Sequence, residues 1–459
     1  MDLFRKKDIN PVAAQGEPLK RCLSAFDLIL LGIGAIVGAG IFIITGVVAA
    51  THAGPGIIFS YLLAGFACAC SALSYAELAA AMGGCGSAYG YAYAGFGEFI
   101  AWIVGWDLLL EYSLSVAAVS VGWSGYFNDL LLALTIHLPT SLLQSPLQGG
   151  VLNLLAFTIV VLLSLLLVAG VKSSIFVNNT IVCVKLIVIF LFIGIATTEF
   201  NPKNWVPFLP FGWTGVINGA SLIFFAYIGF DAVSTAAEEV INPQRDLPRG
   251  IIGSLVICTI LYILVSGLLT GVVPYVDLNV ASPISHALML LGYRTAAGIV
   301  GVGAVAGLTT VMLVLFYGLS RIFLAMARDG LLPHYFAYVD ERTRTPIRII
   351  LPCGALIAMT AALLPLNDLA ELVNIGTLFA FATVCTGVIV LRVTQPGMVR
   401  PFKTPLMPYV PVLGVISCGY LMVNLPWFTL LRFVVWLVVG FIIYFSYGRK
   451  NSALQPVAR

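Results

Sequence analysis

The sequence predicts an all-α integral membrane protein with twelve transmembrane helices. Of its 459 residues, 60% are hydrophobic and only 9% are charged, and the mean hydropathy is +1.03. Soluble domains carry about 25% charged residues, so this chain lacks the polar surface of a soluble protein. Its long apolar runs favour helices over the short alternating strands of a barrel. Twelve crossings of about 20 residues each leave no room for a sizeable soluble domain.

The apolar runs between polar, glycine and proline breaks define the twelve spans in order. They lie near residues 26–51, 56–82, 96–127, 150–170, 176–197, 214–240, 250–273, 295–328, 347–364, 370–391, 408–424 and 428–447. The chain is therefore expected to consist of an N-terminal segment, 1–25, a twelve-helix domain, 26–447, and a C-terminal tail, 448–459.

Basic residues are concentrated on one side of the predicted spans. With the N-terminus inside, 18 of the 23 Lys and Arg residues fall in inner segments, and only Lys203, Arg294 and Arg432 fall in outer ones. The positive-inside rule then places both termini in the cytoplasm. We expect a multi-pass protein of the cell membrane (inner or plasma membrane), in contact with the lipid bilayer.

The first span contains a glycine cluster at mid-membrane. Residues 32–42 read GIGAIVGAGIF, with four glycines in nine residues. Glycine disfavours a helix, so the cluster requires a physical reason. Close helix packing through Gly34 and Gly38 is one explanation, while a dinucleotide fingerprint fits poorly because Val37 stands where its third glycine belongs. The remaining explanation is unwound backbone that lines a binding site.

Unwound backbone at this place suits an α-amino acid. A half-helix beginning near Gly40 points its positive end at the gap, where free N–H groups can hold a carboxylate without an arginine. Freed carbonyls just upstream, such as that of Ile36, can accept hydrogen bonds from an ammonium group. The sixth span is also irregular, because Asp231 follows Gly229 within an apolar run. If spans 1–5 and 6–10 form an inverted repeat, the two interruptions occupy corresponding positions, which is typical of a transporter site.

Four motifs resemble the amino acid–polyamine–organocation (APC) transporters, and within them the bacterial cationic amino acid transporter branch. The motifs are the glycine cluster at 32–42, GWDLLLEY at 105–112, FFAYIGFDAVSTAAEE at 224–239 and YGLSRIFLAMARDGLLP at 317–333. The resemblance covers roughly residues 20–447. It implies the LeuT-like APC fold, a five-plus-five inverted repeat of residues 26–197 and 214–391, with two extra C-terminal helices in 408–447. It also implies alternating access around a central site.

The resemblance further implies which residues form that site. The residues that would hold the α-amino and α-carboxyl groups are Ile36, Gly38, Ala39, Gly40, Phe225, Ala226 and Ile228. Phe225 would be the aromatic gate above the substrate. Close relatives often have a hydroxyl residue at the position of Ala39, so this chain departs from the pattern at a side-chain contact. Leu315 would face the substrate side chain, where it takes up volume and offers a guanidinium no acceptor. It therefore favours small neutral amino acids such as alanine, despite the cationic label of the branch.

Two charged residues lie in the middle of predicted spans. Lys185 is far from either interface, so its ammonium group must be paired, bound to backbone or neutral for part of a cycle. In similar proton-coupled transporters a lysine at this place stands where sodium-coupled relatives bind a structural sodium ion. The alternative to a role in proton coupling is a lysine that is fixed permanently to first-span carbonyls. Glu111, one turn after Asp107, could bind a cationic side chain, pair with Lys185, carry a proton or serve the structure alone.

Other segments leave functional and structural explanations open. Glu238 and Glu239, near Arg245 and Arg249, suit either gate pairing or ordinary solvated charge. Residues 83–93 predict a short interfacial helix rich in tyrosine. The four histidines lack metal-ligand spacing, and no catalytic constellation or phosphate loop is present in the sequence. We therefore expect no metal site, no enzymatic activity and no nucleic-acid partner.

The sequence as a whole predicts a secondary active transporter of L-α-amino acids, small neutral or cationic. Lys185 and Glu111 are the candidates for proton coupling, and no cofactor is expected beyond the coupling proton. A sodium-coupled carrier or an amino acid exchanger on the same fold is the alternative. A passive channel also fits the composition, whereas a membrane-embedded enzyme would need a catalytic constellation. The sequence does not decide whether a small accessory membrane subunit is bound.

Overall fold

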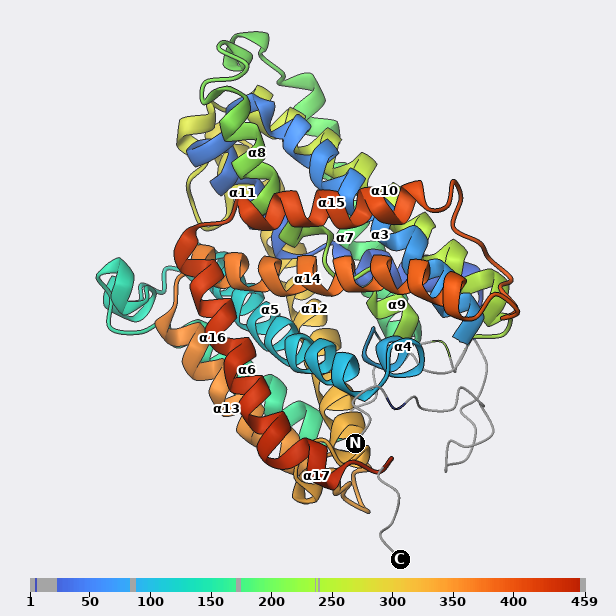
Figure 1. Cartoon of the computed structure of the whole chain (residues 1–459). Coiled ribbons are helices and arrows are strands. Elements are labelled where there is room, and N and C mark those ends of the chain that lie inside the picture. The colour runs from blue at the N-terminus through green and yellow to red at the C-terminus, as the bar shows by residue number, and fades with distance from the viewer. Residues whose placement is uncertain are drawn as a thin grey trace, which may run out of the picture.

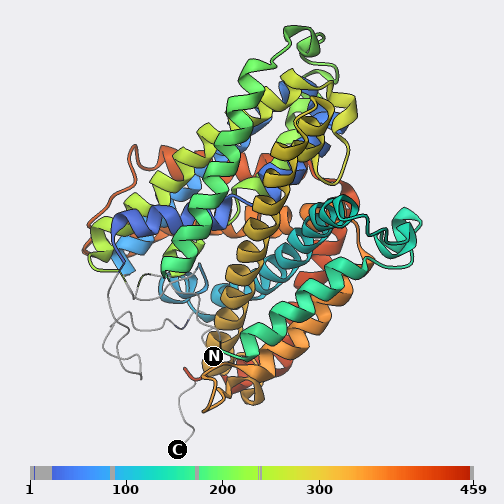
Figure 2. The ribbon, with the colours of Figure 1, turned by 180° about the vertical axis from the view of Figure 1, so that it is seen from behind.

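The computed structural model describes residue 5 and residues 23–82, 88–170, 175–235, 237 and 240–454. These residues are mostly helical, and the one pairing of extended backbone among them is an isolated bridge between Leu23 and Val240. Long helices run through the body of the molecule and cross one another at several angles (Figures 1 and 2). The all-α fold class predicted from the sequence is therefore confirmed.

Among the described residues, eight helical segments are long and apolar enough to cross a membrane. They are Gly40–Met82, Glu98–Ala133, Asn179–Thr198, Gly212–Ser234, Pro243–Val272, Arg294–Arg328, Leu366–Thr394 and Trp427–Asn451. Four shorter apolar helices accompany them: α1 (Ala25–Ile36), α6 (Leu154–Val168), α13 (Ile347–Leu363) and α15 (Tyr409–Val423). Lipid offers backbone N–H and C=O groups no partner, and a helix satisfies these groups internally. The chain is a multi-pass membrane protein.

Most predicted spans agree with these helices to within a few residues. The remaining long helices are α3 (Ile57–Met82), α5 (Glu98–Ala133), α7 (Ile175–Thr198), α8 (Gly212–Ile223), α10 (Pro243–Val272), α12 (Arg294–Arg328), α14 (Leu366–Thr394) and α16 (Trp427–Ile443). α10 begins well before the expected residue 250. Pro243 occupies its first turn, where proline is tolerated, and Pro248 is accommodated inside the helix, although both suggest breaks in the sequence.

Two further differences from the predicted spans concern the C-terminal end of α5 and a short helix before α12. α5 continues past the expected residue 127, because Asp129 remains helical and accepts a hydrogen bond from the Ser282 hydroxyl. A short helix that the sequence did not predict, α11 (Pro283–Leu290), precedes α12. The interfacial helix predicted within 83–93 is present as α4 (Ala88–Gly95), while residues 83–87 lie outside the described residues.

α5 lies at the centre of the helix packing. It packs against α12, α14, α6 and α13, while α1 packs against α10 and α7. The periphery exposes large apolar side chains such as Leu162, Leu165 and Phe190. In a membrane protein such a surface faces lipid, because lipid tails solvate apolar groups as well as a protein core does. The buried faces of α1, α5 and α12 inside this packing are therefore shielded from lipid and can carry a polar site.

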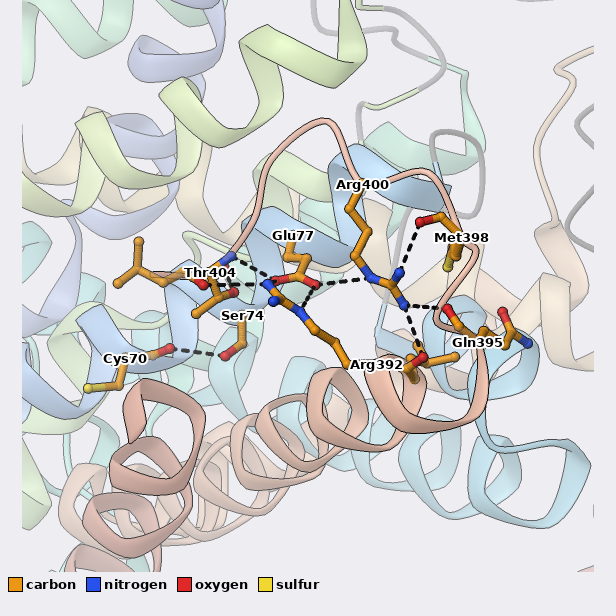
Figure 3. Close-up of polar contacts among 10 residues, drawn as sticks. Cys70, Ser74, Glu77, Arg392, Gln395, Met398, Arg400 and Thr404 are labelled. Carbon is orange, nitrogen blue, oxygen red and sulfur yellow. Dashed lines mark hydrogen bonds and ion pairs between the residues drawn. The ribbon is translucent and has the colours of Figure 1, made fainter. Parts of the chain in front are cut away.

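A buried cluster around Glu77 joins the C-terminal end of α14 and the segment before α15 to α3 (Figure 3). The Glu77 carboxylate accepts two hydrogen bonds from the Arg392 guanidinium, at 2.9 and 2.7 Å, and one from the Thr404 backbone N–H at 2.7 Å. Arg400 forms a second ion pair with it at 3.3 Å and also donates to the carbonyls at the end of α14. One carboxylate thus holds together segments that are more than 300 residues apart in sequence.

We predict that Glu77→Gln destabilises the protein by about 3–5 kcal/mol, because two guanidinium groups lose the charge that compensates their burial. The measurement is thermal unfolding of the purified protein in detergent. Asp368→Asn is the matched control, because Asp368 pairs with Arg432 at 3.4 Å near the surface, with 31% and 49% of the two side chains exposed. Such a surface pair contributes roughly 0–1 kcal/mol. Equal losses in the two variants would contradict the assignment.

Candidate functional site

The first transmembrane segment is broken at the predicted place. α1 ends at Ile36, and Val37 leaves the helix with φ −74° and ψ 93°. A π-helical turn, η2 (Gly40–Ile44), then restarts the segment and continues through α2 (Thr45–Val48). The first N–H groups of a helix have no partner within it, and they carry the positive end of the helix dipole. The break therefore presents donors for an anion on one side and carbonyl acceptors on the other.

The second break lies after α8. A 3₁₀ turn, η8 (Phe224–Tyr227), ends in Ile228 with φ −61° and ψ 135°, and helix resumes only at α9 (Ala232–Thr235). Between them Gly229 has φ +117°, a conformation that side chains with a Cβ rarely adopt. The Asn374 amide on α14 donates to carbonyls of the last turn of α8. Side-chain donors thus replace the helical hydrogen bonds lost at the break.

The two breaks touch each other through glycine. A Cβ on Gly40 would lie 2.3 Å from the Cα of Ala226, and a Cβ on Gly229 would lie 2.9 Å from backbone atoms of Ala35. The Tyr262 hydroxyl on α10 lies 2.8 Å from the carbonyl oxygens of both Ile36 and Ala226. A hydroxyl has one proton, so it donates to one of these carbonyls at a time and links the two breaks.

A small cavity of about 20 Å³ lies between the breaks, with room for about one water molecule. Its lining consists of Ala35, Ile36, Gly38, Ala39, Gly40, Ser115, Val119, Phe225, Ile228, Val311 and Leu315. Seven of the eight residues that the sequence proposed for binding are therefore brought together here. Ala226 is the exception, because it packs against Gly40 rather than lining the cavity. Phe225 and Leu315 are both buried at this site.

Sequence reasoning missed the contribution of α5 to the cavity. Ser115 and Val119 line it, and the Ser115 hydroxyl has no hydrogen-bond partner among the described residues. It is also the one polar side chain in the lining. The signal was available in the sequence, because Asp107, Glu111, Ser115 and Val119 recur every four residues and so share one face of a helix. Val311 on α12 was missed as well, one turn before Leu315.

Lys185 on α7 is fully buried and points at the first break. Its Nζ donates to the carbonyls of Gly34, at 2.8 Å, and Val37, at 3.1 Å. Gly307 on α12 makes room for the lysine chain, since a Cβ there would lie 2.8 Å from the lysine Cε. Within the described part of the chain, no hydrogen bond or ion pair joins Lys185 to Glu111. The pairing of these two residues that the sequence left open is therefore not formed.

Three buried carboxyl groups lie near the second break. Glu111 on α5 interacts electrostatically with both Asp107 and Asp231. The Tyr112 hydroxyl donates to Asp231 at 3.2 Å, whereas both oxygens of Asp107 and one of Glu111 have no hydrogen-bond partner in the described segments. None of the three forms an ion pair with a described lysine or arginine. Neighbouring buried carboxylates repel each other strongly, because the surrounding medium screens charge poorly.

The remaining sequence predictions concern the ends of the helices. Glu238 and Glu239 lie outside the described residues. Arg245 and Arg249 are exposed at the start of α10. Asp329, at the end of α12, accepts a hydrogen bond from the Tyr89 hydroxyl of α4 at 2.8 Å. The site is thus confined to the two breaks and the faces of α5, α7, α10 and α12 that surround them.

A helical membrane protein whose two broken helices meet at a small buried cavity has the architecture of a membrane transporter. The sequence matches the family model "Amino acid permease" over residues 23–447, and the chain belongs to this family. The family and the relatives described next are transporters of the APC superfamily rather than enzymes, as the sequence motifs predict.

The chain is similar along its whole length to two transporters of Bacillus subtilis (strain 168). It is 50% identical to the branched-chain amino acid permease BcaP and 48% identical to the methylthioribose transporter, with 99% of each chain covered in both comparisons. It is also 40% identical to the vacuolar cationic amino acid transporter 4 of Arabidopsis thaliana, over 82% of this chain and 64% of that protein. These relatives belong to one family, but their names specify different substrates.

Proposed function

We propose that the chain is a proton-driven secondary active transporter of small neutral L-α-amino acids that works by alternating access. The observation that carries the proposal is the meeting of two broken helices at a buried cavity whose lining side chains are apolar apart from that of Ser115. Broken helices near the membrane midplane are where secondary transporters bind substrate.

The proposed topology has twelve crossings. The eight long segments and the four shorter apolar helices together supply one helix for each predicted span. The long segment Gly40–Met82 contains both the end of the first span and the whole of the second. Residues 26–197 and 214–391 would form the two inverted halves, since each half begins with a broken helix. Residues 408–447 would add two further helices. The 18-to-3 distribution of basic residues favours a cytoplasmic position for the termini, 1–25 and 448–459, in the cell membrane.

The backbone of the first break would recognise the parts that all α-amino acids share. The N–H groups at the start of η2 suit the carboxylate, since Gly38, Ala39 and Gly40 leave the backbone accessible. Carbonyls of Ile36 and the second break suit the ammonium group. The Ser115 hydroxyl would supply a side-chain contact in this cavity, in a chain that lacks the hydroxyl common in close relatives at Ala39.

The side-chain end of the cavity favours a neutral apolar substrate. Val119, Val311, Leu315 and Phe225 line it, and no charged side chain does so among the described residues. A cationic side chain would enter this lining without an acceptor, at a large desolvation cost. A thiosugar would leave the donors for a carboxylate unused. We therefore favour alanine-sized substrates, with Phe225 as the gate that covers them.

Proton coupling is proposed for Lys185 and Glu111. The Lys185 ammonium holds two carbonyls of the first break directly, so the loss of its proton would release them. Glu111 shares a buried environment with Asp107 and Asp231 and no described cation, which suits a group that gains and loses a proton. Sodium coupling is the alternative, but the lysine occupies carbonyl oxygens of the kind that a sodium ion needs as ligands.

The test of this function is uptake of radiolabelled alanine into proteoliposomes under imposed pH and sodium gradients, with a panel of unlabelled competitors. Accumulation driven by an inward pH gradient supports the proposal, and accumulation that needs sodium supports the alternative. Strong competition by methylthioribose, with none by alanine, would contradict an amino acid substrate.

We predict that Lys185→Ala abolishes concentrative alanine uptake driven by an inward pH gradient, while exchange across the membrane survives. We expect this loss of uptake because the variant lacks the proton-carrying group that contacts the Gly34 and Val37 carbonyls. Lys203→Ala is the control, because Lys203 is exposed in a loop segment. A variant that accumulates alanine with normal pH dependence would leave Lys185 with a structural role only.

We predict that Glu111→Gln slows gradient-driven uptake, because an amide cannot exchange a proton with its carboxyl neighbours. If Glu111 also senses a cationic side chain, transport of lysine falls more than that of alanine. Glu341→Gln, at an exposed carboxylate in the loop before α13, is the control. Wild-type kinetics for both alanine and lysine would assign Glu111 to structural pairing.

We predict that Leu315→Ser raises competition by arginine relative to alanine, by up to about 10- to 200-fold, the range of one pocket side chain at roughly 1–3 kcal/mol. The change removes volume and adds an acceptor at the end of the cavity. The measurement is inhibition of labelled alanine uptake by arginine, lysine and leucine. Leu313→Ser, on the same helix but outside the lining, is the control. An unchanged arginine-to-alanine ratio would mean that Leu315 does not limit the pocket.

A further inference from the structure

A second recess, which shares no lining residue with the central cavity, lies at the start of α10. We propose that it binds the headgroup of an anionic phospholipid of the inner leaflet. This inference rests on the orientation proposed above, in which the start of α10 faces the cytoplasm, but it does not depend on the transported substrate or on the coupling ion.

The recess is a groove of about 650 Å³ between α10 and the segment that leads into α15. Its lining consists of Gln244, Arg245, Pro248, Arg249, Ile252, Gly253, Pro401 and Phe402. The segment before α15 and the start of α10 lie side by side at one edge of the molecule in both views (Figures 1 and 2). The Glu77 cluster fixes this segment through Thr404, two residues after Phe402. The groove therefore has one firmly held wall.

The polar part of the groove is positively charged. Arg245 and Arg249 are four residues apart, so they lie on one face of α10, and both are exposed. Neither guanidinium group forms a hydrogen bond or an ion pair within the described ranges of the chain. Asp246 between them is buried. Arginine binds phosphate oxygens through two parallel N–H donors, and the first turn of a long helix adds partial positive charge. The groove suits a phosphate group.

The apolar surface that continues from the groove distinguishes a lipid from a free phosphate. Along α10, Ile252 in the groove is followed by Val256, Ile260 and Leu264, which are exposed and spaced along one face. α3, which packs against both α10 and α15, exposes Leu62, Leu63 and Phe66. α15 itself exposes Val412, Ile416 and Tyr420. A ligand with a phosphate headgroup and acyl tails would contact both the arginines of the groove and this apolar surface. Basic residues at a cytoplasmic interface bind anionic lipids in this way.

The test uses the purified full-length chain in an uncharged detergent, with retention of added phosphatidylglycerol or phosphatidylcholine measured by native mass spectrometry. We expect preferential retention of phosphatidylglycerol. The double variant Arg245→Gln with Arg249→Gln should lower that retention by about tenfold or more. Arg328→Gln with Arg342→Gln is the matched control, because it removes the same charge from exposed arginines outside the groove. Thermal unfolding without lipid shows whether each variant is folded.

Unchanged retention of phosphatidylglycerol in the groove variant, or an equal loss in the control, would overturn the proposal. Displacement of phosphatidylglycerol by millimolar inorganic phosphate would overturn it in favour of a site for a free anion. Alanine uptake, measured after the same proteins are reconstituted into proteoliposomes, separates the two inferences. Lipid selectivity without alanine uptake refutes the transport proposal alone, and normal alanine uptake without lipid selectivity refutes the lipid site alone.

Discussion

The structure depends on one constraint: backbone polar groups inside a membrane must find partners within the protein. Two helices break in the buried interior of the protein, and each break frees carbonyls from helical hydrogen bonding. Lys185 binds those of Gly34 and Val37, and the Tyr262 hydroxyl lies between those of Ile36 and Ala226. Such groups cost about 1–3 kcal/mol each when left unpaired. The side chains that relieve this cost, Lys185 and Tyr262, therefore help to hold the two breaks in place.

Glycine residues allow the two breaks to approach each other closely. Gly40 lets the first break approach the Ala226 backbone, and Gly229 lets the second approach Ala35. The resulting cavity has room for about one water molecule, so the proposed binding of an amino acid there would require the two breaks to separate. Their separation would stretch the contacts of Tyr262 with both breaks. Opening of the site and the hydrogen bonding of the breaks are therefore physically coupled.

Several features of the site follow from the sequence, because they are local. The glycine cluster at 32–42 and Gly229 beside Asp231 predict the two breaks, and Leu315 and Phe225, both named from the sequence, line the cavity between them. Features that depend on contacts between distant segments do not follow. Periodicity shows that Glu111 and Ser115 share a face of α5, but not which helix that face meets. The partners of Glu77 are more than 300 residues away, and Tyr262 has no local signal at all. The start of α10 was misplaced because proline is a break in one context and a first-turn residue in another.

The separation of Lys185 from Glu111 bears on how protons could act at this site. Lys185 touches the first break, whereas Glu111 and Asp231 lie at the second. Under the proposed coupling, each proton site acts on a different unwound segment, and the two segments touch through Gly40, Gly229 and Tyr262. A change of charge at either site would then reach the other through backbone contact rather than through an ion pair. On this view the substrate, which binds the backbone of both breaks, completes the link that neither charged residue makes directly.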